Sequence, residues 1–374
     1  MRRRVLIVGA TGQFGARLAR RIAPWPDVEL VLAARARDRL DALAAELGTG
    51  EVAVLDRRDL TALKRLNAWA VIDCAGPFQG QSYDAPKAIL EAGAHYVDLA
   101  DARDFVVGFP KALAALAVQR GLAAVSGASS TPALSCAVVD QLTARWTRID
   151  RVWAAISPAG RTRVGPSVVK AILSWAGQPV SIFTGGEWKT RPGWGGARRV
   201  PMPHIGRRWL SLAETPDLDL FVDRYRPKDE AMFAAGVESA FSHLSLSLLS
   251  VLVRWRFLPS LAAFAGPLHW ASERAASFGS TTGGMLVRAE GLDATGAPAK
   301  AEWALWAYDN FGPYVPTLAA AATLRALLDG KIAAGAQTAS GLVPLDDILA
   351  QASGLPIYWT PAKRAPASAA AEVA

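Results

Sequence analysis

Short apolar runs alternate with helical patterns through the first third of the chain, and this alternation constrains the fold more than any other feature. The runs are rich in Val, Ile and Leu without regular polar alternation, which is typical of strands buried on both faces. Between them apolar residues recur at helical spacing, as at Leu40, Leu43 and Leu47. This order predicts an α/β fold with a Rossmann-type, doubly wound parallel sheet. The runs cover residues 5–8, 29–33, 52–55, 70–74, 96–99 and 123–126.

The turn after the first run carries three glycines at the spacing GxxGxxG. Gly9 lets the chain leave the strand sharply, Gly12 leaves room for a pyrophosphate, and Gly15 lets the next helix pack close to the strand. The start of that helix offers N–H groups and a positive dipole end to phosphates. The context predicts a dinucleotide site, with a structural glycine turn as the alternative. The expected cofactor contacts in the turn are Gly9, Thr11, Gly12, Gln13, Phe14 and Gly15.

The end of the second strand distinguishes NADP from NAD. NAD sites place an acid there for the ribose 2′-hydroxyl, whereas this chain has Arg35. A guanidinium group suits a 2′-phosphate through charge-assisted hydrogen bonds, so we predict NADP(H) as the cofactor. The alternative is that Arg35 is a solvated surface charge. Asp56, after the third strand, is placed to approach the adenine side of the cofactor.

Three motifs together match a known family. The chain opens with "VLIVGATGQFG" at residues 5–15, ends its fourth strand in "CAGPF" at 74–78, and continues with "EAGAHYVDL" at 91–99. This order closely resembles the saccharopine dehydrogenase-like oxidoreductases, strongly over residues 5–135 and more weakly over 280–350. The resemblance implies an NADP-dependent oxidoreductase and a homodimer. It also implies that Ala75, Gly76 and Pro77 flank the nicotinamide ribose, and we include Cys74 in the cofactor site.

The loop after the sixth strand departs from the family's saccharopine reductases. Those enzymes carry a Cys-Gly-Gly-Leu-Pro-type loop there, and this chain has Ala128-Ser129-Ser130-Thr131-Pro132. The departure argues against saccharopine as the substrate. Relatives in the family include homospermidine- and carboxyspermidine-type enzymes and trans-acting enoyl reductases, so the family does not define a substrate.

A second domain is expected beyond residue 130. Residues 151–157, 285–290 and 300–308 alternate as strands, and the turn at 293–296 joins the last two into a hairpin. Trp303 and Trp306 fall on opposite faces, which predicts an α+β domain whose mixed sheet has aromatic residues on both faces. We expect an NADP-binding Rossmann domain at 1–130 onto which 315–358 packs back, a substrate and dimerisation domain at 131–314, and a disordered tail at 361–374.

Residues 239–253 carry no charge and are rich in Leu and Val. A spanning helix needs about 20 apolar residues. We therefore favour a buried or interface helix, with a membrane-surface helix and a true span as alternatives. Basic residues interleave with Trp over 188–209, which fits an anionic membrane, a substrate carboxylate or phosphate, or a solvated mobile loop. A peripheral membrane contact through 186–270 is thus one expectation.

Composition excludes several other classes of function. The net charge is +8, from 41 basic and 33 acidic residues, and the bases are mostly Arg in an Ala-rich chain. Genome composition explains this excess as well as nucleic acid does, so we expect no nucleic-acid partner. Cys74 and Cys136 cannot form a disulfide framework, and no cysteine or histidine spacing indicates a metal. The first apolar run is too short for a signal peptide, so we expect a cytoplasmic protein.

The candidate catalytic residues are Asp98, Asp101 and Tyr83. Nicotinamide enzymes usually need a proton donor. Asp98 and Asp101 leave the fifth strand at the edge where doubly wound sheets build their sites, although each also suits a helix cap. Tyr83 and Lys87 have the YxxxK spacing of short-chain dehydrogenases. That pair comes right after the fourth strand and contains Pro86, so coincidence is the favoured interpretation.

These observations predict an NADPH-dependent reductase that acts on a C=N or activated C=C bond. The apolar and aromatic residues of the second domain favour a bulky apolar or acyl small-molecule substrate over a small dicarboxylic amino acid. One alternative is a non-catalytic NADP-binding sensor, since GATGxxG turns also occur in such regulators. The other is a peripheral membrane-associated protein in which the nucleotide site is vestigial.

Overall fold

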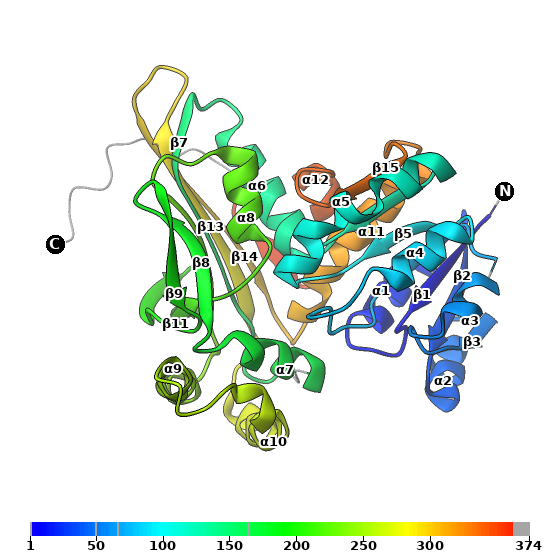
Figure 1. The fold of residues 1–374 in the computed structure, drawn as a ribbon, viewed down its shortest axis with the longest axis horizontal. Helices are drawn as coiled ribbons and strands as arrows, with labels where there is room; N and C mark the ends of the chain where they lie inside the picture. Colours follow the sequence, from blue (N-terminus) through cyan, green and yellow to red (C-terminus); the bar gives the residue numbers. More distant parts are fainter. Residues whose placement is uncertain (1, 49–50, 66, 163–164, 362–374) are drawn as a thin grey trace. The chain divides into compact units, whose positions relative to one another are not determined.

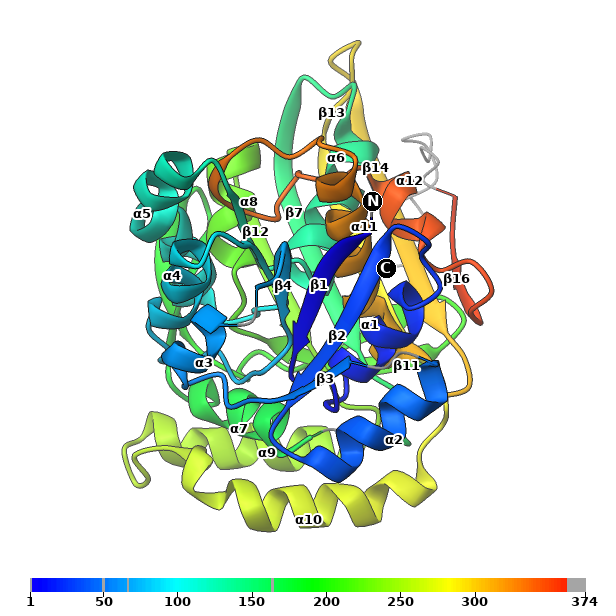
Figure 2. The same cartoon turned by 90° about the vertical axis from the view of Figure 1, so that its right-hand side faces the viewer.

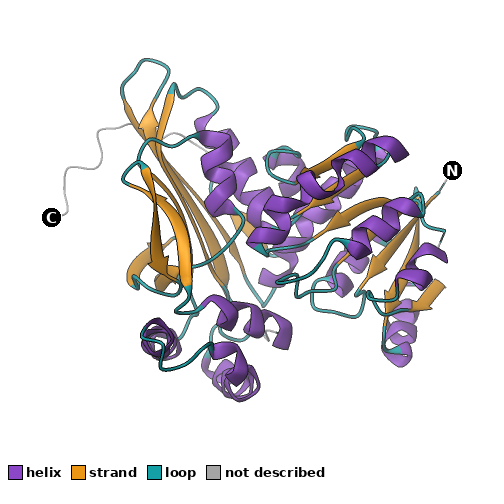
Figure 3. Ribbon diagram, viewed as in Figure 1, coloured by secondary structure: helices purple, strands orange, loops and turns teal. Residues whose placement is uncertain are grey.

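The computed structural model of the protein describes residues 2–48, 51–65, 67–162 and 165–361 (Figure 1). The chain divides into two units: the first comprises Met1–Leu134 and Pro313–Ser353, and the second Ser135–Gly312 and Gly354–Ala374. The predicted fold class is confirmed, because one unit holds a parallel sheet and the other a mixed sheet (Figure 3). The predicted disordered tail at 361–374 lies, apart from Pro361, outside the described residues.

The first unit is built on a seven-stranded sheet in the order β15-β6-β5-β4-β1-β2-β3, with every pair parallel. The six predicted strands are all present. Five are largely buried, as expected of continuous apolar runs, whereas β3 lies at the sheet edge and is partly exposed. The strand order reverses between β1 and β4. The strands are β1 (Arg3–Val8), β2 (Val28–Ala34), β3 (Glu51–Val54), β4 (Ala70–Asp73), β5 (His95–Asp98), β6 (Ala123–Ser126) and β15 (Gly335–Thr338).

Helices cover both faces of this sheet. Helices α3, α4 and α5 pack together on one face, and α1, α11 and α12 on the other (Figure 2). Gly48 and Gly121 end α2 and α5 in the left-handed conformation that glycine adopts most readily. The helices are α1 (Gly15–Ile22), α2 (Arg37–Leu47), α3 (Leu60–Arg65), α4 (Asp84–Glu91), α5 (Arg103–Arg120), the π-helix η1 (Ser130–Leu134), α11 (Val315–Leu328) and α12 (Leu345–Ala350).

Helix α11 returns the chain to the first unit and packs there through a buried row of small side chains. Ala320 and Ala321 are fully buried, and the helix contacts α1, η1 and α12. Arg325 ties the helix to the start of β2: its guanidinium pairs with Asp27 at 2.6 Å and lies 4.1 Å from the centre of the Trp25 ring. The small side chains let the helix backbone approach its neighbours closely, at the packing density of a protein core.

The second unit contains a mixed sheet in the order β10-β11-β12-β7-β13-β14-β16, with the β8–β9 hairpin attached to β12. Strands β12 and β7 run parallel, and the other neighbours run antiparallel. The strands are β7 (Arg148–Ser157), β8 (Pro179–Thr184), β9 (Glu187–Pro192), β10 (Arg198–Met202), β11 (Gly206–Leu212), β12 (Glu230–Ala235), β13 (Gly283–Leu292), β14 (Pro298–Ala307) and β16 (Ile357–Trp359).

The segment that returns to the first unit ends earlier than the expected residue 358. Because β16 pairs with β14, the chain leaves the first unit after Ser353. The hairpin between β13 and β14 closes where the Asp293 N–H donates to the Ala297 carbonyl at 2.9 Å. Its two tryptophans lie on opposite faces of the sheet, as expected. Trp303 is fully buried, whereas the ring of Trp306 stacks on that of His204 with the ring centres 3.7 Å apart.

Two expectations about the middle of the chain need correction. The basic segment at 188–209 is not a mobile loop, because β9, β10 and β11 occupy most of it. The segment at 239–253 is helical, as part of α9 (Ala240–Arg254). Four of its apolar side chains are exposed, so it is not a buried helix, and an interface helix stays a prediction. None of the helices among the described residues is long and apolar enough to cross a bilayer. The remaining helices are α6 (Ser135–Thr143), α7 (Pro166–Trp175), α8 (Asp217–Tyr225), η2 (Leu261–Phe264), α10 (Ala265–Ala275) and η3 (Ala276–Phe278).

The packing of α11 predicts that Ala320→Leu destabilises the first unit. The added side chain has no space there, and overpacking of this kind costs about 1–3 kcal/mol. Ala115→Leu on α5 is the matched control, because Ala115 is exposed and alanine and leucine have similar helix propensities. Urea denaturation should place the control within about 0.5 kcal/mol of the wild type. Equal effects of the two substitutions would contradict this description of α11.

Candidate functional site

The carboxyl ends of β1 and β4 border the point where the strand order reverses, which is where doubly wound sheets bind ligands. Two glycines shape this edge. Gly9 has a φ of +75°, and a Cβ atom there would lie 3.0 Å from the Ala75 nitrogen. A Cβ atom on Gly15 would lie 2.2 Å from the Gly9 carbonyl oxygen. The start of α1, the turn after β1 and the loop after β4 therefore touch through backbone alone.

The N-terminus of α1 is suited to an anion. Its cap residue, Phe14, makes no side-chain capping hydrogen bond, and the first turn carries no acid. The first N–H groups of a helix have no acceptor within the helix, so a phosphate can satisfy them. The Gly12 N–H closes the preceding turn on the Gly9 carbonyl at 2.9 Å, and Gly12 is exposed. The glycine turn and the start of α1 therefore have the features of a pyrophosphate site.

Arginines gather where β2 ends beside this turn. Arg35 is exposed directly after the strand, in the position expected for contact with a 2′-phosphate. Arg37 instead pairs with Asp41 at 2.9 Å. Arg39, which the sequence analysis missed, donates from Nη2 to the Thr11 carbonyl at 2.8 Å and so lies at the glycine turn. The indication that the sequence offered for this role was a further arginine four residues after Arg35.

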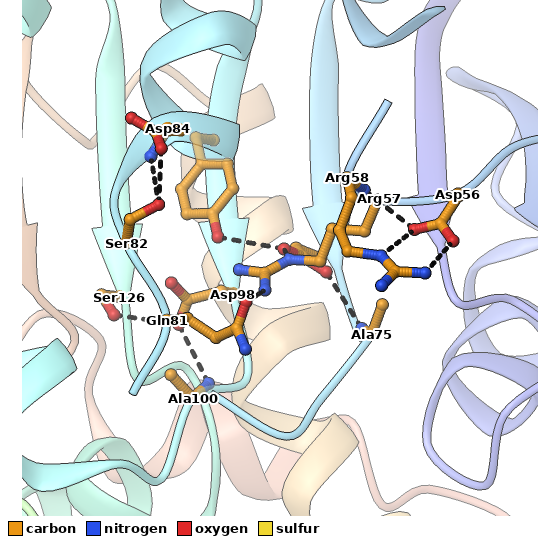
Figure 4. A network of polar contacts seen from close by, with 12 residues as sticks. Asp56, Arg57, Arg58, Ala75, Gln81, Ser82, Asp84, Asp98, Ala100 and Ser126 are labelled. Atoms are coloured by element: carbon orange, nitrogen blue, oxygen red, sulfur yellow. Dashed lines mark hydrogen bonds and ion pairs between the residues drawn. The ribbon is translucent and has the colours of Figure 1, made fainter. Parts of the chain in front are cut away.

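Asp56 lies after β3, where it was expected, and is already paired. Arg58 donates to its carboxylate from the backbone N–H at 2.9 Å and from Nη2 at 2.8 Å (Figure 4). The hydrogen bonds from Arg58 lower the pKa of Asp56, and the nearby charge of Arg35 acts in the same direction. Asp56 is therefore a fixed negative charge close to Arg35.

A buried ion pair holds the loop after β4. Asp73 is 1% exposed and accepts hydrogen bonds from Arg57 Nε at 2.5 Å and from the Ala75 N–H at 3.0 Å. The Tyr96 hydroxyl lies 3.3 Å from the same carboxylate. The Arg57 guanidinium also covers the Phe78 ring at 4.7 Å. The sequence analysis missed this pair, although an acid that ends an apolar strand was visible. The pair fixes the loop predicted to face the nicotinamide ribose.

Cys74, Ala75, Gly76 and Pro77 follow in that loop, and Gly76 is exposed. Desolvation and the neighbouring carboxylates of Asp73 and Asp98 raise the pKa of the Cys74 thiol well above its ordinary value. The thiol is therefore protonated at neutral pH and is a poor nucleophile. Among the described residues, no group of three or more His, Cys, Asp or Glu side chains is placed to hold a metal ion.

Asp98 is fully buried, and its contacts connect the ends of β5 and β6. Its Oδ1 atom accepts hydrogen bonds from the Ala100 N–H at 2.9 Å and the Ser126 hydroxyl at 3.0 Å (Figure 4). It also accepts one from the Gly127 N–H at 2.8 Å. Burial raises the pKa of Asp98 to about 7 despite these donors. The carboxyl group thus organises the loops around it instead of facing solvent.

The other two candidate catalytic residues differ in accessibility. Asp101 is exposed and accepts a hydrogen bond from Gln79 Nε2 at 3.3 Å. The Tyr83 hydroxyl donates to the Phe105 carbonyl at 3.0 Å, and the two rings lie 4.9 Å apart. Desolvation and the charge of Asp104 raise the pKa of Tyr83, whereas a short-chain dehydrogenase tyrosine needs a lowered pKa. In this geometry Tyr83 joins α4 to α5.

The raised pKa of Asp98 predicts a pH-dependent stability that Asp98→Asn removes. Between the ordinary value of 3.8 and about 7, the folded state keeps a proton that the unfolded state releases. Stability therefore falls as pH rises through this window, by at most about 1.4 kcal/mol per pH unit. Urea denaturation at about pH 5 and about pH 7 should show a smaller loss for Asp98→Asn than for the wild type. Parallel pH profiles would contradict the assignment.

Comparison with known proteins agrees with this geometry. Residues 5–125 match the family model described as the saccharopine dehydrogenase NADP binding domain. No curated protein matches the sequence. Among solved structures, the apo saccharopine dehydrogenase (L-Glu forming) from Saccharomyces cerevisiae has a TM-score of 0.66 at 12% identity, over 96% of this chain and 99% of that one. An engineered D-amino acid dehydrogenase bound to NADP⁺ has a TM-score of 0.49 at 17% identity, over 94% and 99%.

At such low identities the structural likeness describes the fold, and the family model identifies the domain. Its match spans β1 to β6 and so includes the glycine turn, Arg35 and the loop after β4. The prediction of NADP(H) as the cofactor is confirmed at the level of this domain family. Residues 5–125 of the chain are thus similar to the saccharopine dehydrogenase NADP binding domain.

Proposed function

We propose that this protein is an NADPH-dependent reductase of a C=N or activated C=C bond in a bulky apolar or acyl substrate. The observation that carries the proposal is the backbone cradle at the β1–β4 reversal, with exposed Arg35 at the end of the neighbouring β2. An NADP-binding domain, a cradle for the pyrophosphate and a cation for the 2′-phosphate are the parts that such an enzyme requires.

Different residues of the first unit would bind different parts of the cofactor. The amides at the start of α1 would hold the pyrophosphate, and Arg35 the 2′-phosphate. Arg39 would add a second positive charge, since the Thr11 carbonyl already holds it beside the glycine turn. Ala75, Gly76 and Pro77, kept in place by Asp73, would flank the nicotinamide ribose. The chemistry that NADPH supplies when bound is hydride donation.

Asp101 is the best placed of the three candidate catalytic residues. Its carboxyl is exposed beyond the carboxyl end of β5, while Asp98 is buried and the Tyr83 hydroxyl is occupied by a backbone carbonyl. We assign Asp101 the task of orienting a polar group of the substrate, with the Gln79 amide steadying its carboxylate at 3.3 Å. Asp98 and Tyr83 position the loops around it.

The second unit offers an aromatic surface in support of an apolar substrate. Trp306 and Tyr358 stack with ring centres 6.3 Å apart, and Tyr308 lies 5.7 Å from Tyr358. Tyr358 is 50% exposed and Tyr308 is 37% exposed. Large rings with one polar end bind flat apolar groups well, whereas a small dicarboxylic amino acid would need paired cations instead.

Arg35→Gln should lower the affinity for NADPH while leaving that for NADH unchanged. Loss of a charge-assisted hydrogen bond to the 2′-phosphate should weaken NADPH binding about 10- to 100-fold. Arg37→Gln is the matched control, because Arg37 is exposed on the same segment but pairs with Asp41. Fluorescence titration with both dinucleotides provides the measurement. Equal losses for NADPH and NADH would show that Arg35 does not read the 2′-phosphate.

The reductase proposal itself is tested by NADPH oxidation with a panel of imines and enoyl thioesters of increasing chain length. We expect turnover to rise with apolar chain length, and Asp101→Asn to reduce kcat/KM about 10- to 100-fold, as loss of a positioned polar contact does. Asp104→Asn, at an exposed acid three residues further on, should retain activity. Tight NADPH binding without turnover of any substrate would indicate a sensor instead of an enzyme.

A further inference from the structure

Helix α9 turns its apolar side chains away from the protein. Phe241 is 83% exposed and Leu248 is 72% exposed, and Leu244 and Leu252 continue the same row at spacings of three and four residues. Residues at this spacing share one face of a helix. The opposite face buries His243, Ser250 and Val253, so the larger apolar side chains of this row lie on the exposed face of the helix.

Polar contacts fasten the inner face of α9 to the second unit. His243 is fully buried, and its Nε2 lies 2.9 Å from the Ser211 hydroxyl on β11. Trp194 donates its indole N–H to the His243 carbonyl at 3.3 Å. Next to Ser250, the backbone passes so close to Gly177 that a Cβ atom there would lie 2.3 Å from the Ser250 carbonyl oxygen. These contacts prevent the helix from rotating its apolar row into the core.

The apolar row continues beyond α9 into the segment that leads to α10. This segment has exposed aromatic side chains at three positions, and Trp270 on α10 is a fourth. Both helices lie at the same end of the second unit (Figures 1 and 2). Single exposed apolar residues are ordinary, but a row of this length marks an interaction site. We name it the α9–α10 surface, defined by Phe241, Leu244, Leu248, Leu252, Trp255, Phe257, Phe264 and Trp270.

The charges on this surface are mostly positive. Residues 239–272 contain Arg254 and Arg256 and no Asp or Glu. Both arginines are exposed next to Trp255 and Phe257. Just beyond the segment, the Arg274 guanidinium lies 3.9 Å from the centre of the Trp270 ring. Glu273, exposed on α10, is the one acid among residues 239–274, and three arginines outnumber it. A second copy of the chain docked symmetrically here would bring two sets of excess positive charge together, whereas anionic lipid headgroups would complement that charge.

We propose that the α9–α10 surface binds the face of a membrane that contains anionic lipids, with α9 lying in the plane of the interface. Leucine and phenylalanine side chains would enter the acyl boundary, the tryptophan rings would sit at headgroup level, and the arginines would contact lipid phosphates. A helix of 15 residues with one apolar face suits this position and is too short to cross the bilayer. The inference is independent of the proposed reductase activity.

Vesicle flotation of the full-length protein tests the inference. Vesicles of phosphatidylcholine alone are compared with phosphatidylcholine mixed with phosphatidylglycerol, at low and high salt. We expect binding to the anionic vesicles, weakened by salt because screening reduces the attraction of arginine to phosphate. Leu248→Asp should abolish binding, and Arg254→Gln and Arg256→Gln should each reduce it about fivefold.

The matched control is Val118→Asp, which places the same charge at a residue 62% exposed on α5 in the first unit. It should leave flotation unchanged, and circular dichroism should show all variants folded, since every substitution is at an exposed site. Absence of binding to anionic vesicles would overturn the proposal, as would equal flotation of Leu248→Asp and the wild type. Conversion of a dimer to a monomer by Leu248→Asp, without vesicle binding by the wild type, would instead identify the surface as a contact between two copies.

Discussion

The close approach of α1 to β1 is the constraint on which the first unit depends. With a carbonyl of the turn 2.2 Å from where a Gly15 Cβ would stand, any larger residue would push the helix away from the strand. The same turn packs against the loop after β4, so one glycine-lined contact sets the positions of α1, β1 and β4 together. The helix N-terminus then points at the gap left by the strand reversal, which is the property that makes this edge a phosphate site.

Buried carboxylates give this edge its rigidity. Asp73 and Asp98 are register partners at the ends of β4 and β5, and each accepts an N–H from the residue two positions further along its own loop. Isolated charges in such positions are costly. Burial raises the pKa of both carboxyl groups. The charge of Arg57 opposes that rise at Asp73, whereas only neutral donors oppose it at Asp98. Two neighbouring loops are thereby fixed, and Asp101 lies beyond them at the exposed edge.

The features that could be predicted from the sequence are those encoded within a few neighbouring residues. Buried parallel strands are continuous apolar runs, and the glycine turn and Arg35 lie within a single strand–turn–helix segment. Arg39 and Arg57 were missed because their partners are 28 and 16 residues away, and only the folded sheet brings them together. The pairing of Tyr83 with the Phe105 carbonyl could not be predicted for the same reason, although the residue itself stood out.

Elements without a strong apolar pattern were also missed. Strand β15, with the sequence Gly-Ala-Gln-Thr, has few residues that favour strands and exists because β6 offers it an edge. The basic strands β9 to β11 have exposed faces, so their arginines resembled a loop. For α9 the sequence pattern predicted a helix but not whether its apolar face points into the protein or away from it. An apolar face indicates that something covers it, but not what that is.

The central claim is that the cradle at the β1–β4 reversal holds NADP(H). A crystal structure of the protein with NADP⁺ tests it most directly. The account predicts the pyrophosphate on the amides at the start of α1, the 2′-phosphate on Arg35, and the nicotinamide ribose against Ala75, Gly76 and Pro77. A dinucleotide bound elsewhere, or a cradle filled by protein side chains at saturating NADP⁺, would contradict it.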